Sequence, residues 1–156
     1  MTDSSPTPGA PQPGTPDVST ASRVIAEVID KYTDDLVALR RDLHAHPELS
    51  WQENRTVARV CEHLDGTGWN IVPLESGGLI ADIGTSGPLV ALRADLDALP
   101  VDDLTKDPWT SKVPGVAHAC GHDVHTSGLV GAGLALAEVA ERGLLPGRVR
   151  LLFQPA

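Results

Sequence analysis

The stretch of residues 124–142 constrains the fold of this chain more than any other part. Its middle, residues 128–137, reads Gly-Leu-Val-Gly-Ala-Gly-Leu-Ala-Leu-Ala and is apolar on nearly every side. We predict a helix here that stops at Gly143, because glycine commonly ends helices. A helix without a polar face has to be covered by neighbours on more than one side. The stretch is too short and too interrupted to predict a membrane span.

Short apolar segments before and after this helix predict a sheet that covers it. Residues 89–92 form a continuous apolar run, which is typical of a strand buried on both faces. Residues 148–153 predict another buried strand, which we expect to present an unpaired edge. Residues 69–74 and 78–83 predict a hairpin. The expected fold class is α/β, with helices on a mostly parallel sheet that is incomplete at the C-terminus.

The N-terminal part of the chain divides into a tail and two predicted helices. Residues 1–18 contain five prolines and too few apolar side chains to offset the entropy of ordering, so we predict a disordered, Pro-rich tail. From residue 19 to about residue 44, apolar residues recur every three or four positions, which predicts an amphipathic helix. Ser50 and Glu53 have the spacing of a capping box, which predicts a second helix beginning there.

The charge balance and the cysteine content exclude several classes of protein. Twelve Lys and Arg residues stand against 21 Asp and Glu residues, which gives a formal net charge of −9. Nucleic acids and anionic membranes need a basic face, so we expect neither as a partner. Two cysteines do not make a disulfide framework, and Cys61 is expected to be an inert core thiol rather than a partner of Cys120. The expected localisation is cytoplasmic, because no cleavable signal is visible.

Residues 118–126 concentrate side chains that bind metal ions. They read His-Ala-Cys-Gly-His-Asp-Val-His-Thr and hold three of the six histidines and one of the two cysteines. Thiolate and neutral imidazole are good zinc ligands, and Cys120 and His122, two positions apart, point to the same side of an extended backbone. Asp123 is a candidate to orient a ligating imidazole. The alternative is a cysteine packed as a small hydrophobe beside surface histidines.

Two carboxylates follow the predicted strand at residues 89–92. Asp95 and Asp97 lie two positions apart, and Arg93 precedes them. Open α/β sheets build their sites at the carboxyl ends of strands. We therefore expect this pair near a functional site, although an Asp after a strand is often only a turn or cap residue.

Four sequence motifs follow one another along the chain. They are RRDLHAHPEL from residue 40 followed by Glu53 and Thr56, RADLDALP from residue 93, HACGHDVHT from residue 118, and FQPA from residue 153. In sequence and in order they resemble the motifs of the M20-type metallo-amidohydrolases, a family that includes the N-acyl-amino-acid, hippurate and indole-acetyl-amino-acid hydrolases. The resemblance implies that residues 19–156 are the N-terminal part of a three-layer αβα zinc-exopeptidase-like catalytic domain.

The resemblance also implies roles for individual residues. Cys120 and His122 are implied to bind a pair of divalent ions, Zn or Mn, with the thiolate bridging them. Asp97 is implied to lie beside this centre as the catalytic residue that helps orient it. Structural or supporting roles are expected at three further motif positions, which are His44, Glu48 and His125. The implied reaction is metal-dependent hydrolysis of the amide bond of N-acyl amino acids or small peptides, by a full-length form that is a homodimer or larger.

The chain also departs from the pattern of the family. A Glu pair that holds the general base is expected directly after Ala156, followed by two His ligands and an inserted lid or dimerisation domain, and none of these is among the 156 residues. We therefore expect an N-terminal fragment that is inactive alone. One rival hypothesis is a non-catalytic remnant that at most binds a metal ion. Another is a cysteine hydrolase in which Cys120 is the nucleophile and a His is the base.

Overall fold

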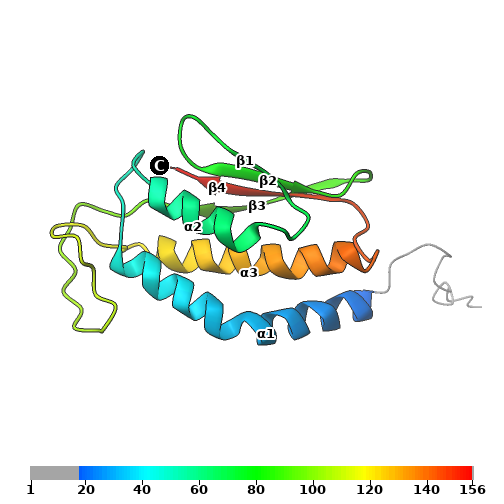
Figure 1. Ribbon diagram of the computed structural model, residues 1–156, viewed down its shortest axis with the longest axis horizontal. Coiled ribbons are helices and arrows are strands. Elements are labelled where there is room, and N and C mark those ends of the chain that lie inside the picture. The colour runs from blue at the N-terminus through cyan, green and yellow to red at the C-terminus, as the bar shows by residue number, and fades with distance from the viewer. Residues whose placement is uncertain (1–17, 156) are drawn as a thin grey trace, which may run out of the picture.

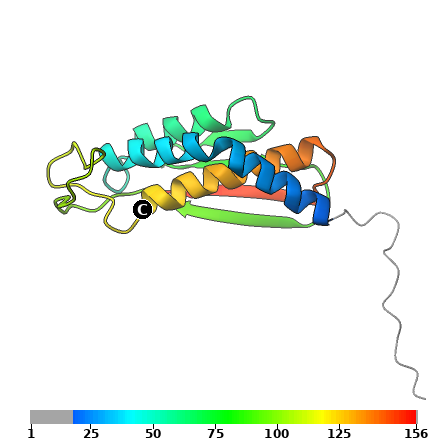
Figure 2. The same ribbon diagram turned by 90° about the horizontal axis from the view of Figure 1, so that it is seen from below.

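The computed structural model describes residues 18–155 and has the α/β architecture predicted from the sequence (Figure 1). All three helices lie on one side of the sheet, and α3 lies between the sheet and α1 (Figures 1 and 2). The predicted Pro-rich tail lies outside the described residues, apart from Val18, which begins the first helix. The elements are α1 (Val18–Ala45), α2 (Asn54–Leu64), β1 (Asn70–Pro73), β2 (Leu79–Ile83), β3 (Leu89–Asp95), α3 (His122–Glu141) and β4 (Arg148–Gln154).

The sheet is mixed, and its strand order is β1-β2-β4-β3. Strand β2 pairs antiparallel with both β1 and β4, whereas β3 and β4 are parallel neighbours connected through α3. The expectation of a mostly parallel sheet is therefore wrong for the described residues. The physical reason is the short connection between β1 and β2, since a tight turn allows only antiparallel pairing, and this hairpin then adds to the side of β4 that faces away from β3.

The positions of β3 and β4 correct two further expectations. Strand β4 pairs on both sides, so residues 148–153 have no unpaired edge. The edge strands among the described residues are β1 and β3, and in β3 Leu89 and Val90 are 47% and 55% exposed. The predicted burial of residues 89–92 on both faces is therefore wrong, because β3 has one strand neighbour and the described helices cover only one face of the sheet.

Helix α3 is covered on more than one side, as predicted, and its glycines set how closely its neighbours approach. A Cβ atom added to Gly131 would lie 2.9 Å from Leu36 Cδ1 of α1. A Cβ atom added to Gly133 would lie 2.9 Å from Leu64 Cδ2 of α2 and 3.0 Å from Leu151 Cδ1 of β4. All three separations are shorter than ordinary packing contacts, so the missing side chains let three elements pack directly on the α3 backbone.

None of the helices within residues 18–155 combines the length and the apolar character needed to cross a membrane. Both cysteines are free, so the expectation of no disulfide is confirmed. Cys61 packs against the main core, and burial raises the pKa of its thiol. This environment fits the expectation of an inert core residue.

The beginning of α2 differs from the predicted capping box. The helix begins at Asn54, and the N-cap residue Glu53 forms no side-chain capping bond. The cap comes from Glu48 instead, whose carboxylate accepts hydrogen bonds from the backbone N–H groups of Arg55 and Thr56 at 3.0 and 2.8 Å. These are two of the N–H groups that a helix leaves without an internal partner, so Glu48 has the structural role expected for it.

Candidate metal centre

The first turn of α3 lies beside the carboxyl end of β3. Gly121, with a φ of +78°, takes the left-handed conformation that turns the chain into the helix. The hydroxyl of Thr126 lies 3.2 Å from the Asp95 carbonyl oxygen and 2.8 Å from the His122 carbonyl oxygen. These contacts hold the strand end and the helix start together. The polar residues at 95–97 and 122–125 therefore share one end of the parallel β3–β4 pair.

Asp97 holds the imidazole of His122 in one orientation. His122 Nδ1 lies 2.9 Å from Asp97 Oδ1 and 2.9 Å from the Asp97 carbonyl oxygen. Both neighbours are acceptors, so Nδ1 carries the proton and donates. Nε2 is then left with a free lone pair, which is the tautomer needed to bind a metal ion. Ser50 in turn donates to Asp97 Oδ2 at 3.3 Å, which fixes the carboxylate.

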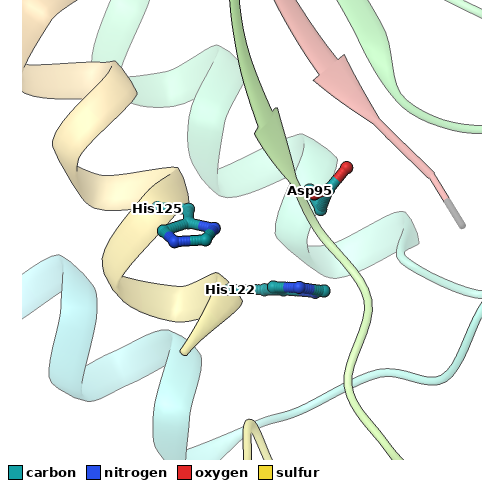
Figure 3. A group of neighbouring side chains, drawn as sticks. All are labelled: Asp95, His122 and His125. Carbon is teal, nitrogen blue, oxygen red and sulfur yellow. The ribbon is translucent and has the colours of Figure 1, made fainter. Parts of the chain in front are cut away.

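The structure brings together three ligand-type residues, Asp95, His122 and His125 (Figure 3). One ligand atom from each lies within 4.8 Å of the others. The rings of His122 and His125 are stacked, with centroids 5.6 Å apart. Arg93 donates through Nε and Nη2 to Asp95 Oδ1 at 3.0 and 2.7 Å, so Oδ2 stays available for another partner. We call these three residues the triad.

Cys120 lies outside the triad. It is an exposed, free cysteine in the turn that precedes α3, and it is not one of the three residues whose ligand atoms cluster. Its predicted pairing with His122 on a metal therefore stays a prediction. The sequence motif drew attention to Cys120 because of its spacing, whereas Asp95 and His125 come together with His122 through the packing of α3 on β3.

Asp123 does not orient the ring of His122, which corrects the role expected for it. Its side chain is 1% exposed, and Oδ2 lies 2.8 Å from His44 Nδ1 and 2.9 Å from Arg40 Nε, both on α1. His44 Nε2 lies 3.3 Å from Asp103 Oδ2, in the loop between β3 and α3. Asp97 takes the orienting role instead, and Asp123 points to α1 because the helical turn rotates it away from His122.

His118 is a further buried member of this region. It is 5% exposed, and neither ring nitrogen has a hydrogen-bond partner among the described residues. Burial lowers the pKa of His118, so the ring is neutral at neutral pH. Its ring centroid lies 6.5 Å from that of His44. Neither Arg40 nor Asp103 was assigned to this group from the sequence: Arg40 opens the motif at residue 40 without a role of its own, and Asp103 lies outside the four motifs. We call Arg40, His44, Asp103, His118 and Asp123 the buried network.

Comparison with known proteins identifies the family to which the chain is similar. Residues 91–156 match the model of the peptidase family M20/M25/M40. An N-acetylcysteine deacetylase of Bacillus subtilis (strain 168) is 46% identical over 125 residues, which cover 78% of this chain and 32% of that protein. An N-acyl-L-amino acid amidohydrolase of Geobacillus stearothermophilus is 42% identical over 135 residues, which cover 85% and 36%. A Rhodococcus jostii (strain RHA1) protein that bears the name of a glutamate–cysteine ligase is 54% identical over 123 residues, which cover 78% and 15%.

A solved structure agrees with these matches. The YxeP protein of Bacillus subtilis, described as a dinuclear metal-binding peptidase from the M20 family, superimposes with a TM-score of 0.75 at 42% identity. The superposition covers 81% of this chain and 36% of that one. The resemblance to the M20-type metallohydrolases predicted from the four motifs is therefore confirmed. The chain spans between 15% and 36% of the length of the three curated relatives.

Proposed function

We propose that the protein to which these residues belong is a metal-dependent amidohydrolase that cleaves the amide bond of N-acyl amino acids or small peptides. The observation that supports this best is the hydrogen bond between His122 Nδ1 and Asp97 Oδ1 at 2.9 Å. A carboxylate that holds the far nitrogen of an imidazole is the usual support of a metal-bound histidine. The pair lies at the strand end where α/β folds place their sites, within the segment that matches the M20 family.

The roles of individual residues are part of this proposal. His122 and Cys120 are proposed to bind divalent metal, Zn or Mn, in a centre of two ions, and Asp97 is proposed as the catalytic residue that positions His122. The chain offers imidazole, thiolate and carboxylate groups, which fit both of these ions. A bound ion would polarise the substrate carbonyl and lower the pKa of bound water. Asp97 keeps the free lone pair of His122 on Nε2, because its two oxygen acceptors hold the proton on Nδ1.

The substrate, the cellular location and the oligomeric state are also part of this proposal. Two relatives are named for the hydrolysis of N-acetylcysteine and of N-acyl-L-amino acids. We propose a small N-acylated amino acid or peptide as the substrate, a cytoplasmic location, and a homodimer or larger assembly for the whole protein. The net charge of −9 supports a partner other than nucleic acid or an anionic membrane.

The deciding experiment is a hydrolysis assay on the protein expressed from its complete coding sequence. With Zn²⁺ or Mn²⁺ present, we expect release of the amino acid from N-acetyl amino acids, and loss of this activity with a chelator or with His122→Ala. Residues 1–156 alone, which are expected to be inactive, form the second arm. His63→Ala is the matched control, because His63 lies on α2 and, within residues 18–155, hydrogen-bonds only to the Arg59 carbonyl oxygen.

Three other results would change the assignment. Activity that resists the chelator and disappears with Cys120→Ala would support the cysteine-hydrolase hypothesis. Metal binding by the complete protein without any turnover of acylated amino acids or peptides would support the non-catalytic remnant. Chelator-sensitive turnover by residues 1–156 alone would show that the general base lies within them.

A further inference from the structure

We infer that Ser50 is a positioning residue for Asp97, and that the left-handed backbone of Trp51 places the Ser50 hydroxyl against this carboxylate. The inference rests on the proposed role of Asp97 in holding His122, and it names the residues that hold Asp97 itself. The sequence predicts Ser50 only as a helix cap and indicates no role for Trp51. In the structure, Glu48 caps α2 instead, and the Ser50 hydroxyl donates to Asp97.

The backbone of Trp51 is in an uncommon conformation. Residues 49–52 form a tight turn, closed by a hydrogen bond from the Gln52 N–H to the Leu49 carbonyl oxygen at 3.0 Å. Trp51, the third residue of this turn, has a φ of +64°, and every other residue with a positive φ in the described part of the chain is a glycine. Its side chain is 64% exposed, so burial of the indole does not account for this conformation. Strained backbone of this kind persists only where the surrounding structure holds it, and it clusters at functional sites.

The chain on both sides of this turn is fixed. Before it, the Glu48 carbonyl oxygen accepts a hydrogen bond from the Ala98 N–H at 2.8 Å, and Leu49 pairs with Ala98 in a parallel bridge. After it, α2 begins at Asn54, and the Glu48 carboxylate caps that helix. Because Ala98 directly follows Asp97, these contacts hold the turn beside the Asp97 carboxylate.

The Ser50 hydroxyl restricts a side chain that could otherwise rotate. It donates to Asp97 Oδ2 at 3.3 Å, while Asp97 Oδ1 accepts from His122 Nδ1 at 2.9 Å. The terminal torsion of an aspartate is broad, so a carboxylate held at one oxygen alone still turns about its Cβ–Cγ bond. The Asp97 side chain is 12% exposed, which leaves little water to hold the second oxygen. Ser50 therefore keeps Oδ1 directed at His122 without being a ligand itself.

The test compares His122 in variants of the protein expressed from its complete coding sequence. Nitrogen NMR of the imidazoles, recorded on metal-free protein at one fixed pH, reports which ring nitrogen of His122 carries the proton. We expect Ser50→Ala to raise the share of the Nε2–H tautomer, because Asp97 then holds the Nδ1–H less firmly. Zn²⁺ affinity, measured by calorimetry, should fall by about two- to tenfold, which is the range that one hydrogen bond contributes.

Two serine variants serve as controls for this measurement. Ser50→Thr keeps the hydroxyl, so its tautomer should be unchanged and its Zn²⁺ affinity should stay within about twofold of the unaltered protein. Ser76→Ala is the matched control, because Ser76 is exposed in the turn between β1 and β2, and it should change neither quantity. Far-UV circular dichroism checks that each variant folds, which is expected because Ser50 is exposed as well.

Two further comparisons separate the positioning role from a general effect on the fold. In an Asp97→Ala background, Ser50→Ala should weaken Zn²⁺ binding no further, because its effect passes through Asp97. Trp51→Gly should retain the tautomer and the affinity of the unaltered protein, since glycine takes a positive φ readily. Trp51→Val should resemble Ser50→Ala, because a β-branched residue is strongly disfavoured at a positive φ.

The inference is overturned if Ser50→Ala leaves the tautomer of His122 unchanged, or if it weakens Zn²⁺ binding equally with and without the Asp97 carboxylate. If Trp51→Gly resembles Ser50→Ala, the indole and not the left-handed backbone places the hydroxyl, and that part of the inference is wrong. The tautomer is measured without metal or substrate. A shifted tautomer in Ser50→Ala, together with a complete protein that hydrolyses no acylated amino acid, would therefore overturn only the proposed function.

Discussion

The triad and the buried network are built by the same stretch of chain, yet they lie in opposite environments. His122 and His125 lie beside Asp95, and His125 and Asp95 line an open groove, whereas His118 and Asp123 are buried beside His44 of α1. Successive residues of a helix point about 100° apart, so one turn of α3 serves both sides. The difference teaches that a dense run of ligand-type residues does not form a single site. Part of the run stabilises the fold, and part is left free to bind.

Substitutions in the two groups are expected to have different effects, because one group is buried and the other is in contact with solvent. In the buried network, the Asp123 carboxylate is removed from water and contacts both Arg40 and His44, so removing it leaves charged or polar partners unpaired. In the triad, solvent reaches the side chains, and their loss leaves no buried group without a partner. We therefore expect substitutions in the network to act on stability and substitutions in the triad to act on binding.

The largest effect is expected for Asp123→Ala. The substitution leaves Arg40 and His44 without their carboxylate, and breaking a buried ion pair in this way costs about 3–5 kcal/mol in the free energy of unfolding. Urea unfolding monitored by circular dichroism measures it. Asp102→Ala, at an exposed position in the next loop, is the control and should cost less than about 0.5 kcal/mol. Equal free energies of unfolding for the two variants would show that the buried network does not stabilise the fold, and the contrast with the triad would be lost.

Asp97 lies between the two environments and should affect binding more than stability. Asp97→Ala removes the acceptor that fixes the tautomer of His122, so we expect metal affinity to fall by about 10- to 100-fold. Asp97→Asn keeps an oxygen acceptor for Nδ1 and should lose less. Calorimetric titration with Zn²⁺ of the unaltered protein, Asp97→Asn and Asp97→Ala measures whether their affinities fall in that order. If the Ala variant binds as tightly as the Asn variant, the orienting role is contradicted.

Acid should weaken the buried network through Asp103. Backbone N–H groups of Ser111 and Thr105 donate to its carboxylate and lower its pKa to about 2. Because the pKa in the unfolded chain is about 3.9, the unfolded state binds more protons between these values. The contribution of Asp103 is therefore complete above pH of about 4 and is lost as the pH falls towards 2.

Unfolding free energies measured across this pH range test the role of Asp103. In Asp103→Asn the fall in stability should be shallower than in the unaltered chain. A residual slope is expected, since hydrogen bonds from Arg150 also lower the pKa of Asp82, on another part of the molecule. Identical pH profiles for the two forms would show that Asp103 does not stabilise the folded loop through its ionised form.

The smallest effect on stability is expected for His125→Gln. The side chain is exposed and makes no hydrogen bond within the described residues, so the free energy of unfolding should change by less than about 0.5 kcal/mol. Metal-free protein is used for this measurement, again by urea unfolding. A loss of several kcal/mol would mean that the triad supports the fold as the network does, and the comparison between them would fail.

Local patterns were enough to predict most of the elements. The spacing of apolar residues predicted α1, and the turn at residues 75–77 predicted the β1–β2 hairpin. The apolar character of residues 128–137 predicted that α3 is covered on several sides. Each of these signals depends on residues close together in the chain. The capping box at Ser50 failed because Glu48, from outside the local pattern, supplies the cap of α2.

The sequence by itself determined where side chains of a metal-ligating type are concentrated and which segments are helices and strands, because both follow from residue type and short spacing. Tertiary structure alone decided the order of the strands and the partners of each polar side chain. His44 and Asp123 are 79 positions apart, and Asp95 and His125 come from different elements. Such contacts depend on how α1 and β3 pack against α3, and residue spacing within one segment contains no record of that packing.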